Sequence, residues 1–161
     1  MSYNDSMTST WTGASGPYFD KYSAIGRGSV SVEVTDADFN LTYRDGIPFY
    51  VRRNVAMTAF NASPEPVRKG APIKVTGSVS RLSVGTFGAA KYVPYASHQV
   101  DIYFRPLTSA KYTKVSSTLT TLAGAFARNI TATVDGCWKA YSVQTSNNVG
   151  RWSPADCVDV Q

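Results

Sequence analysis

The sequence predicts an all-β protein: an antiparallel β-sandwich preceded by a strand-forming extension. Apolar and polar residues alternate over short segments, which is typical of strands that bury one face. Glycine and proline turn signals separate these segments at the spacing of a sandwich or a barrel. The composition agrees, because 10 Tyr, 7 Phe and 3 Trp accompany many Val, Thr and Ser residues, and this mixture favours strands over helices.

Residues 1–27 form the first segment, a polar tail. They are rich in Ser, Thr, Gly, Asn and Asp, a composition typical of a flexible chain. Trp11, Tyr18 and Phe19 interrupt the polar sequence. We expect part of the tail to dock through these aromatic side chains, which makes them candidate binding residues.

Residues 28–54 are predicted to form a β-hairpin extension. Residues 29–35 alternate cleanly, and residues 38–43 could supply a second short strand. Asp45-Gly46 is a turn signal. An isolated two-stranded ribbon is marginal in water, and an unpaired edge is a template for strand addition. We therefore expect these strands to extend the sandwich's own sheet or that of a neighbouring subunit.

Residues 55–161 are predicted to form the sandwich. Pro64 and Pro66 keep its beginning extended, because a helix cannot run across them. From there the chain supplies about seven strands in about 100 residues, the size of an immunoglobulin-like sandwich. The clearest strands lie at residues 73–80, 99–105, 111–120, 125–134, 137–143 and 156–160, with a long loop at 83–97.

Cys137 and Cys157 are the two cysteines of the chain. They lie in alternating segments joined by a polar loop. If these segments are neighbouring antiparallel strands, both sulfurs fall on the outward face and can bond. Disulfides persist in oxidising compartments, so the pair indicates a secreted, extracellular protein.

Trp138 has the opposite parity to Cys137 and is predicted to face the core. The same parity argument on two other strands selects its neighbours, which are Ile73, Val75, Val100 and Ile102. We expect these side chains to pack together between the two sheets.

Several sequence segments carry a resemblance to a known family. They are Asn-Ala-Ser-Pro-Glu-Pro-Val-Arg-Lys-Gly at 61–70, Ile-Lys-Val-Thr-Gly-Ser-Val at 73–79, Val-Asp-Ile-Tyr-Phe-Arg at 100–105, Asp-Gly-Cys-Trp at 135–138 and Asp-Cys-Val-Asp-Val at 156–160. They resemble small secreted actinobacterial proteins with a C-terminal immunoglobulin-like domain. The resemblance covers roughly residues 55–161 and implies an exported domain of mostly unassigned activity, with no catalytic set. It also implies that residues 29–53 correspond to the last hairpin of a preceding β-domain.

Charge and hydropathy limit the partners. The net charge is +5 and the isoelectric point is near 9.3, which can favour acidic partners. The basic residues are scattered, so they indicate a soluble basic surface rather than a nucleic-acid footprint. No run approaches the ~18 apolar residues of a membrane span. We expect neither nucleic acid nor a membrane span.

The titratable residues do not form a recognisable catalytic or metal motif. His98 is the one histidine and lacks a nearby ligand set. Residues 36–40 open like a calcium loop, but Leu41 and Ile47 occupy the positions where Gly and Glu are required. A polar turn between strands is the preferred interpretation. We predict no catalytic residues, no metal and no cofactor.

Aromatic residues at the loops are the remaining candidates. Phe87, Tyr92 and Tyr95 lie in the 83–97 loop, and Trp152 lies in the loop before the last strand. Exposed aromatic side chains suit protein or sugar contacts. The alternative is that they cap the open end of the sandwich, and the sequence favours neither.

Together these observations predict a non-enzymatic exported module that assembles with a protein partner or with itself, as an adaptor or structural subunit, through its N-terminal strands. One alternative is a carbohydrate or cell-wall binding module that contacts a polysaccharide through the loops at 83–97 and 144–153. The second alternative is an enzyme inhibitor or a small hydrolase.

Overall fold

The computed structural model describes residues 25–83 and 90–161, and this part of the chain contains strands and turns but no helix. The prediction of an all-β protein is therefore confirmed for the described residues. The strands run in chain order as β1 (Gly26–Thr35), β2 (Leu41–Val51), β3 (Val55–Ser63), β4 (Pro72–Ser83), β5 (Lys91–Pro94), β6 (Gln99–Pro106), β7 (Thr113–Leu119), β8 (Ala125–Thr131), β9 (Gly136–Ser142), β10 (Arg151–Trp152) and β11 (Asp156–Val158).

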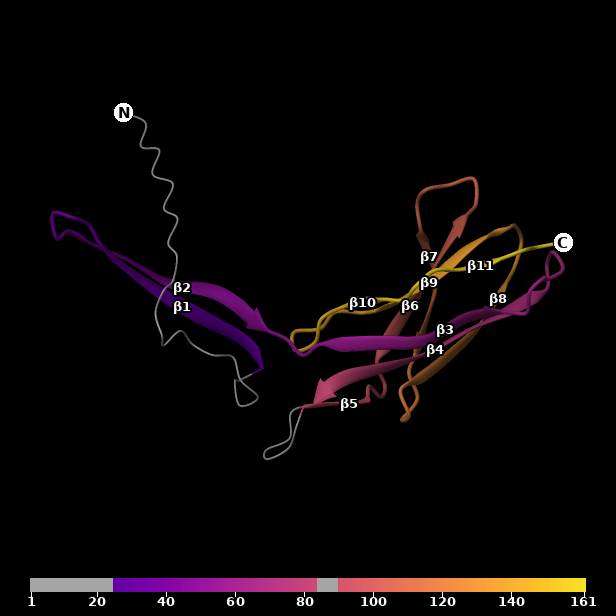
Figure 1. The fold of residues 1–161 in the computed structure, drawn as a ribbon, viewed down its shortest axis with the longest axis horizontal. Helices are drawn as coiled ribbons and strands as arrows, with labels where there is room; N and C mark the ends of the chain where they lie inside the picture. Colours follow the sequence, from indigo (N-terminus) through magenta and orange to yellow (C-terminus); the bar gives the residue numbers. More distant parts are fainter. Residues whose placement is uncertain (1–24, 84–89) are drawn as a thin grey trace.

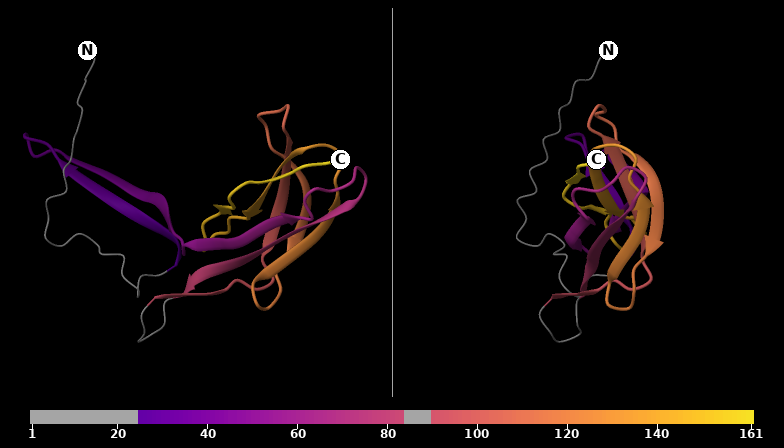
Figure 2. Two further views of the ribbon diagram at one scale, coloured as in Figure 1. Left: turned by 45° about the vertical axis from the view of Figure 1, so that its right-hand side comes forward. Right: turned by 90° about the vertical axis from the view of Figure 1, so that its right-hand side faces the viewer.

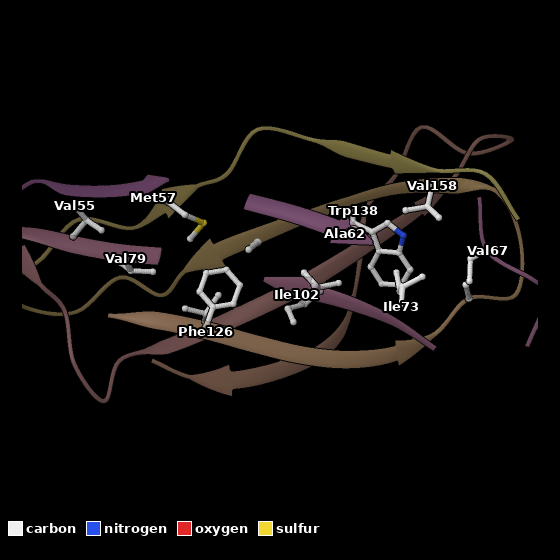
Figure 3. Close-up of a cluster of buried hydrophobic side chains, with 14 residues drawn as sticks. Val55, Met57, Ala62, Val67, Ile73, Val79, Ile102, Phe126, Trp138 and Val158 are labelled. Carbon is white, nitrogen blue, oxygen red and sulfur yellow. The ribbon is translucent and has the colours of Figure 1, made fainter. Parts of the chain in front are cut away.

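These strands form three antiparallel sheets. One sheet has the order β3-β4-β5, with β8 also paired to β4, and the second has the order β10-β9-β6-β7, with β11 also paired to β9. Buried side chains from both sheets form one hydrophobic core between them, so the two sheets make a two-layer sandwich (Figure 3). The third sheet consists of β1 and β2 alone, and it projects from one end of the sandwich (Figure 1).

Strand β4 illustrates how alternation builds the core. Ile73 and Val75 are buried, whereas Lys74 between them is exposed. Further along β4, Gly77 takes an inward position because the Phe126 ring of β8 lies across it. A Cβ atom at position 77 would come within 2.6 Å of that ring. A larger residue there would push Phe126 out of the core.

Trp138 is buried in this core, as predicted. Its side chain is 4% exposed, and Figure 3 shows it beside Ile73 and Val158. The core cluster also contains all of its predicted neighbours, namely Ile73, Val75, Val100 and Ile102. The parity of three strands was therefore read correctly from the sequence.

The predicted disulfide between Cys137 and Cys157 is confirmed. The two residues are direct partners in the β9–β11 register, and they are 20 residues apart in the sequence. The bond therefore joins neighbouring strands within one sheet. Cys137 is nevertheless buried, and the guanidinium Nη2 of Arg105 lies 3.6 Å from its Sγ.

The hairpin turn lies where the sequence predicts a polar turn, but the further turn signal at Asp45-Gly46 does not reverse the chain. The reversal is at 36–40, where the Asp36 carboxylate accepts hydrogen bonds from the backbone N–H groups of Asp38 and Asn40 at 3.0 and 2.8 Å. Hydrogen bonds from Asn40, first from its side chain, and from the backbone of Asp38 hold the pKa of Asp36 below its ordinary value. Residues 36–40 thus form a polar turn between strands, which is the interpretation that the sequence favours over a calcium loop.

Asp45 and Gly46 instead form a bulge inside β2. Two residues of β2 oppose Ser31 of β1, since the register shifts between Val30 and Val32. Gly46 takes a φ of +73° at this point, a value that glycine adopts without strain. The second strand is consequently longer than predicted.

The predicted loop at 83–97 is also partly strand. Strand β4 continues to Ser83, and residues 91–94 of β5 pair back onto it. The hairpin formed by β1 and β2 does not extend either sheet of the sandwich within the described residues. The expectation that it extends the sandwich's own sheet was therefore wrong, and pairing with another subunit stays a prediction.

We expect Trp138→Ala to lower the free energy of unfolding by about 3–5 kcal/mol, because the substitution leaves a cavity in the core. Denaturant unfolding followed by circular dichroism would measure the change. Leu122→Ala is the matched control, since Leu122 is 86% exposed and surface substitutions change stability by about 0.5 kcal/mol or less. An unchanged unfolding midpoint for Trp138→Ala would contradict the core position.

We expect the double variant Cys137→Ala/Cys157→Ala to lose about 3 kcal/mol of stability, because the bond closes a loop of 20 residues and restricts the unfolded chain. Unfolding of the wild type with and without reductant should give the same difference. Mass spectrometry that finds two free thiols in the unreduced wild type would show that the bond does not form.

Candidate functional site

The outer face of the five-stranded sheet carries a group of aromatic side chains. In β6 and β9, Tyr103 is the register partner of Lys139, and Asp101 is the partner of Tyr141. These positions alternate with core positions such as Ile102, so their side chains face away from the core. Strand β10 then places Trp152 beside Tyr141.

Trp152 is the centre of this group. Its ring centroid lies 4.8 Å from that of Tyr103 in an edge-on arrangement, and 4.7 Å from that of Tyr141 in a tilted one. Both are favourable geometries for aromatic pairs. Gly150 makes the arrangement possible, because a Cβ atom there would lie 2.0 Å from the Tyr141 hydroxyl oxygen. Trp152 nevertheless remains 46% exposed.

A cleft of about 400 Å³ opens next to Trp152. It is lined by Tyr103, Tyr112, Lys139 and Trp152. Tyr112 comes from the segment between β6 and β7, so four separate parts of the chain form the cleft. A volume of this size lies within the range of small-molecule binding sites.

Two cationic groups surround the Tyr112 ring. Lys139 Nζ lies 5.1 Å and Arg105 Cζ lies 5.4 Å from its centroid, within the range of cation–π attraction. Arg105 also donates a hydrogen bond to the backbone carbonyl of Ser109 at 2.9 Å. The cleft therefore combines aromatic surface with positive charge.

Asp101 lies on the same outer face but is fully engaged. Its carboxylate accepts hydrogen bonds from Gln99 and Ser117, each at 2.8 Å, and forms an ion pair with Lys114 at 2.8 Å. Burial raises the pKa of Asp101, but the interactions with Lys114, Gln99 and Ser117 outweigh it and leave the pKa lowered. Asp101 is thus an ionised group that fixes β6 against β7.

His98 packs inside the molecule. Its ring stacks on Tyr95 with centroids 3.8 Å apart, and its Nε2 lies 2.8 Å from Ser142 Oγ. A histidine beside a serine can act as the general base for a serine nucleophile. Here, however, both side chains are buried and Ser142 is 0% exposed. A substrate could not reach this hydroxyl, so the pair is explained by packing.

The three predicted aromatic residues that the structure describes, Tyr92, Tyr95 and Trp152, do not form one site. Tyr92 is exposed on β5, whereas Tyr95 is partly buried and its hydroxyl accepts a hydrogen bond from Asn148 Nδ2 at 3.0 Å. Trp152 lies in strand β10 rather than in a loop, on the other sheet. The remaining candidates, Trp11, Tyr18, Phe19 and Phe87, lie outside the described residues.

Sequence reasoning missed the residues that complete the cleft, which are Tyr103, Tyr112 and Lys139. The outward parity of Tyr103 and Lys139 was visible from the alternation of their segments. What the sequence did not show was that the two segments pair, and that β10 returns to cover them. Tyr112 fell inside the strand predicted at 111–120, whereas β7 begins one residue later, at Thr113.

The hairpin formed by β1 and β2 presents a second surface. It contacts the sandwich at its base, where Arg53 N donates to Asn147 O at 2.8 Å and Val149 N donates to Arg53 O at 3.0 Å. Beyond the base it extends away from the two sheets (Figure 2). Its exposed large apolar side chains are Val34, Phe39, Leu41, Tyr43, Ile47 and Tyr50.

Both faces of the hairpin expose apolar groups. The register places Ile47 opposite Val30 and Tyr43 opposite Glu33, so Ile47 and Tyr43 lie on different faces. Tyr43 is 57% exposed and Ile47 is 48% exposed. A sheet that leaves both faces open has no core of its own.

Two other hollows are less suited to a ligand. One lies on the outer face of the four-stranded sheet, lined by Lys74, Ala127, Arg128 and Asn129, and the other is lined by residues around Pro106 and Asp135. Neither includes an aromatic ring. The described residues also contain no cluster of three or more His, Cys, Asp or Glu side chains that could hold a metal ion.

No protein-family model and no curated protein matches this chain. Within residues 25–83 and 90–161, no helix is long and apolar enough to cross a membrane.

Burial of His98 should make stability depend on pH. Burial, and then the charge of Arg81, lower its pKa below the ordinary value of 6.5. The unfolded chain therefore binds this proton more readily, so the stability gained above pH 6.5 is lost as the pH falls below it. We expect the unfolding midpoint to decrease from pH 7 to pH 5 in the wild type and to decrease less in His98→Gln. His98 is the one histidine of the chain, so the variant removes the only imidazole. Equal pH dependence in both proteins would show that His98 does not cause the loss of stability.

Proposed function

We propose that this chain is a non-enzymatic, exported interaction module that assembles through its β1–β2 hairpin, and that its sandwich is immunoglobulin-like. The observation that carries the proposal is the projecting hairpin with apolar groups exposed on both faces. The Cys137–Cys157 bond supports export, because such bonds persist in oxidising compartments.

The strand order supports the immunoglobulin-like assignment. Strands β3, β4 and β8 share one sheet, while β6 and β9 share the other with β7, β10 and β11. In chain order this resembles the arrangement in which strands A, B and E face strands C, F and G. The resemblance to secreted actinobacterial proteins points the same way.

The outer edge of β1 is the expected contact. Strand β2 carries a bulge at Asp45-Gly46 and a proline at position 48, and both features discourage pairing along an edge. Strand β1 has neither, and within the described residues its outer edge has no pairing strand. An edge of this kind accepts a strand from another chain.

The charges of the hairpin favour a second copy as the partner. Arg27, Arg52 and Arg53 lie at the base, whereas Glu33, Asp36 and Asp38 lie toward the turn. Two hairpins related by a two-fold axis perpendicular to their strands run antiparallel, so the basic base of one meets the acidic end of the other. With Arg44 and Asp45 the hairpin carries four positive and four negative side chains.

One register makes this pairing specific. When β1 pairs with β1 of a second copy around residue 30, Arg27 lies opposite Glu33 twice, because 30 is midway between 27 and 33. Both side chains are exposed in the single chain. Opposite charges that face each other across antiparallel strands stabilise the pair.

We expect the wild type to form dimers whose fraction increases with concentration, as measured by sedimentation. Glu33→Lys and Arg27→Glu should each weaken dimerisation about fourfold or more, because like charges would then face each other. The double variant Arg27→Glu/Glu33→Arg should restore the wild-type dissociation constant.

Glu65→Lys is the control for these variants, since it makes the same charge change at an exposed position of the sandwich and should leave the dimer unchanged. A wild type that stays monomeric at every concentration would overturn the proposal. Failure of the charge exchange to restore dimers would overturn the register.

A further inference from the structure

The cleft beside Trp152 is independent of the hairpin, and its chemistry is specific enough to indicate a ligand. Two of its walls, Tyr103 and Lys139, are register partners on β6 and β9, the central strands of the five-stranded sheet. Positions on central strands keep their place without a ligand, which reduces the entropy lost on binding.

The aromatic rings of the cleft favour a ligand with a flat, weakly polar face. Trp152 is 46% exposed although it contacts both Tyr103 and Tyr141. The faces of such rings carry negative charge from the π electrons. A pyranose ring presents C–H groups with a small positive charge on its face, so it can stack on an exposed indole or phenol.

The charges determine which kind of sugar fits. Lys139 and Arg105 both lie near Tyr112, and neither has an acidic partner among the described residues, where the ion pair is between Lys114 and Asp101. A cationic ligand would be repelled by these two groups. A carboxylate would gain a charged partner in Lys139, which lines the cleft, and the charge of Arg105 lies beside the Tyr112 ring.

We propose that the cleft lined by Tyr103, Tyr112, Lys139 and Trp152 binds a pyranose ring of an acidic polysaccharide, with the sugar face on Trp152 and its carboxylate near Lys139. Single-stranded nucleic acid also combines rings with negative charge, but its binding needs a positive groove that follows several phosphates. Here the two positive side chains, Lys139 and Arg105, both lie at the Tyr112 ring and form no continuous groove. The ionised Asp101 lies on the same face of the sheet.

The test uses polygalacturonate as the probe, with fully methyl-esterified polygalacturonate as its uncharged counterpart. Binding to the full chain would be measured by calorimetry. We expect the wild type to bind the acid form at least about tenfold more tightly than the ester, since a hydrogen bond to a charged group is a strong one. Salt should weaken binding of the acid form.

Variants then locate the site. Trp152→Ala should weaken binding of both polymers about tenfold or more, because it removes the stacking surface. Lys139→Gln should weaken binding of the acid form alone. Thermal unfolding of each variant shows whether it is folded, and Trp152→Phe, which keeps a smaller ring, should retain part of the affinity if Trp152→Ala is unstable.

Two matched controls distinguish binding at the cleft from nonspecific binding to other exposed aromatic or basic residues. Tyr92 is an exposed aromatic residue on the other sheet, at 48%, and Lys74 lines a hollow without aromatic rings. Tyr92→Ala and Lys74→Gln should leave binding unchanged. Equal losses in these controls, absence of binding, or equal affinity for acid and ester would overturn the proposal.

An oligonucleotide serves as the competing probe. If a single-stranded DNA displaces polygalacturonate at lower concentration, and Trp152→Ala abolishes its binding, the site belongs to nucleic acid and the proposal is wrong. Glu33→Lys, which weakens pairing of the hairpins, should bind a short galacturonate oligomer as the wild type does, because such a probe occupies a single cleft.

Discussion

The alternation of side chains along β9 is the constraint on which the rest of the sandwich depends. Trp138 and Ala140 point inward and are buried between the sheets, while Lys139 and Tyr141 point outward. Cys137, at the beginning of the strand, ties β11 to the sheet. The core, the disulfide and the cleft are therefore all set by the position of this strand. A shift of one residue in its pairing would exchange the core face with the outer face.

Residues near β9 were predicted well because strand parity is a local property of the sequence. Trp138 was assigned to the core and Cys137 to a bond with Cys157, and both follow from alternation with a period of two residues. The turn at Asp45-Gly46 was predicted wrongly because the same dipeptide suits a bulge as well as a turn. The polar turn predicted at 36–40 is where the chain reverses, because the Asp36 carboxylate accepts hydrogen bonds from the backbone N–H groups of Asp38 and Asn40.

The cleft could not be predicted because its residues meet only through tertiary pairing. Trp152 and Tyr103 are far apart in the sequence, and their contact requires that β10 pair with β9 and that β9 pair with β6. The sequence offered Trp152 as an isolated aromatic residue before the last strand. The alternation of Tyr103 and Tyr141 with core residues indicates outward positions but not that their strands pair. Strand pairing over such distances is determined by the whole core rather than by any local motif.

The two surfaces differ in what stabilises them, and this difference determines how they would act together. The cleft is part of a packed sheet and exists in a single chain, whereas the hairpin exposes apolar groups on both faces among the described residues. Pairing of two hairpins would carry two clefts on one assembly. A long polymer bound at one cleft would then reach the second as an intramolecular step, so its affinity would exceed that of a single site without any new contact. Retention on a repetitive polymer would therefore depend on pairing of the hairpins as well as on the affinity of each cleft.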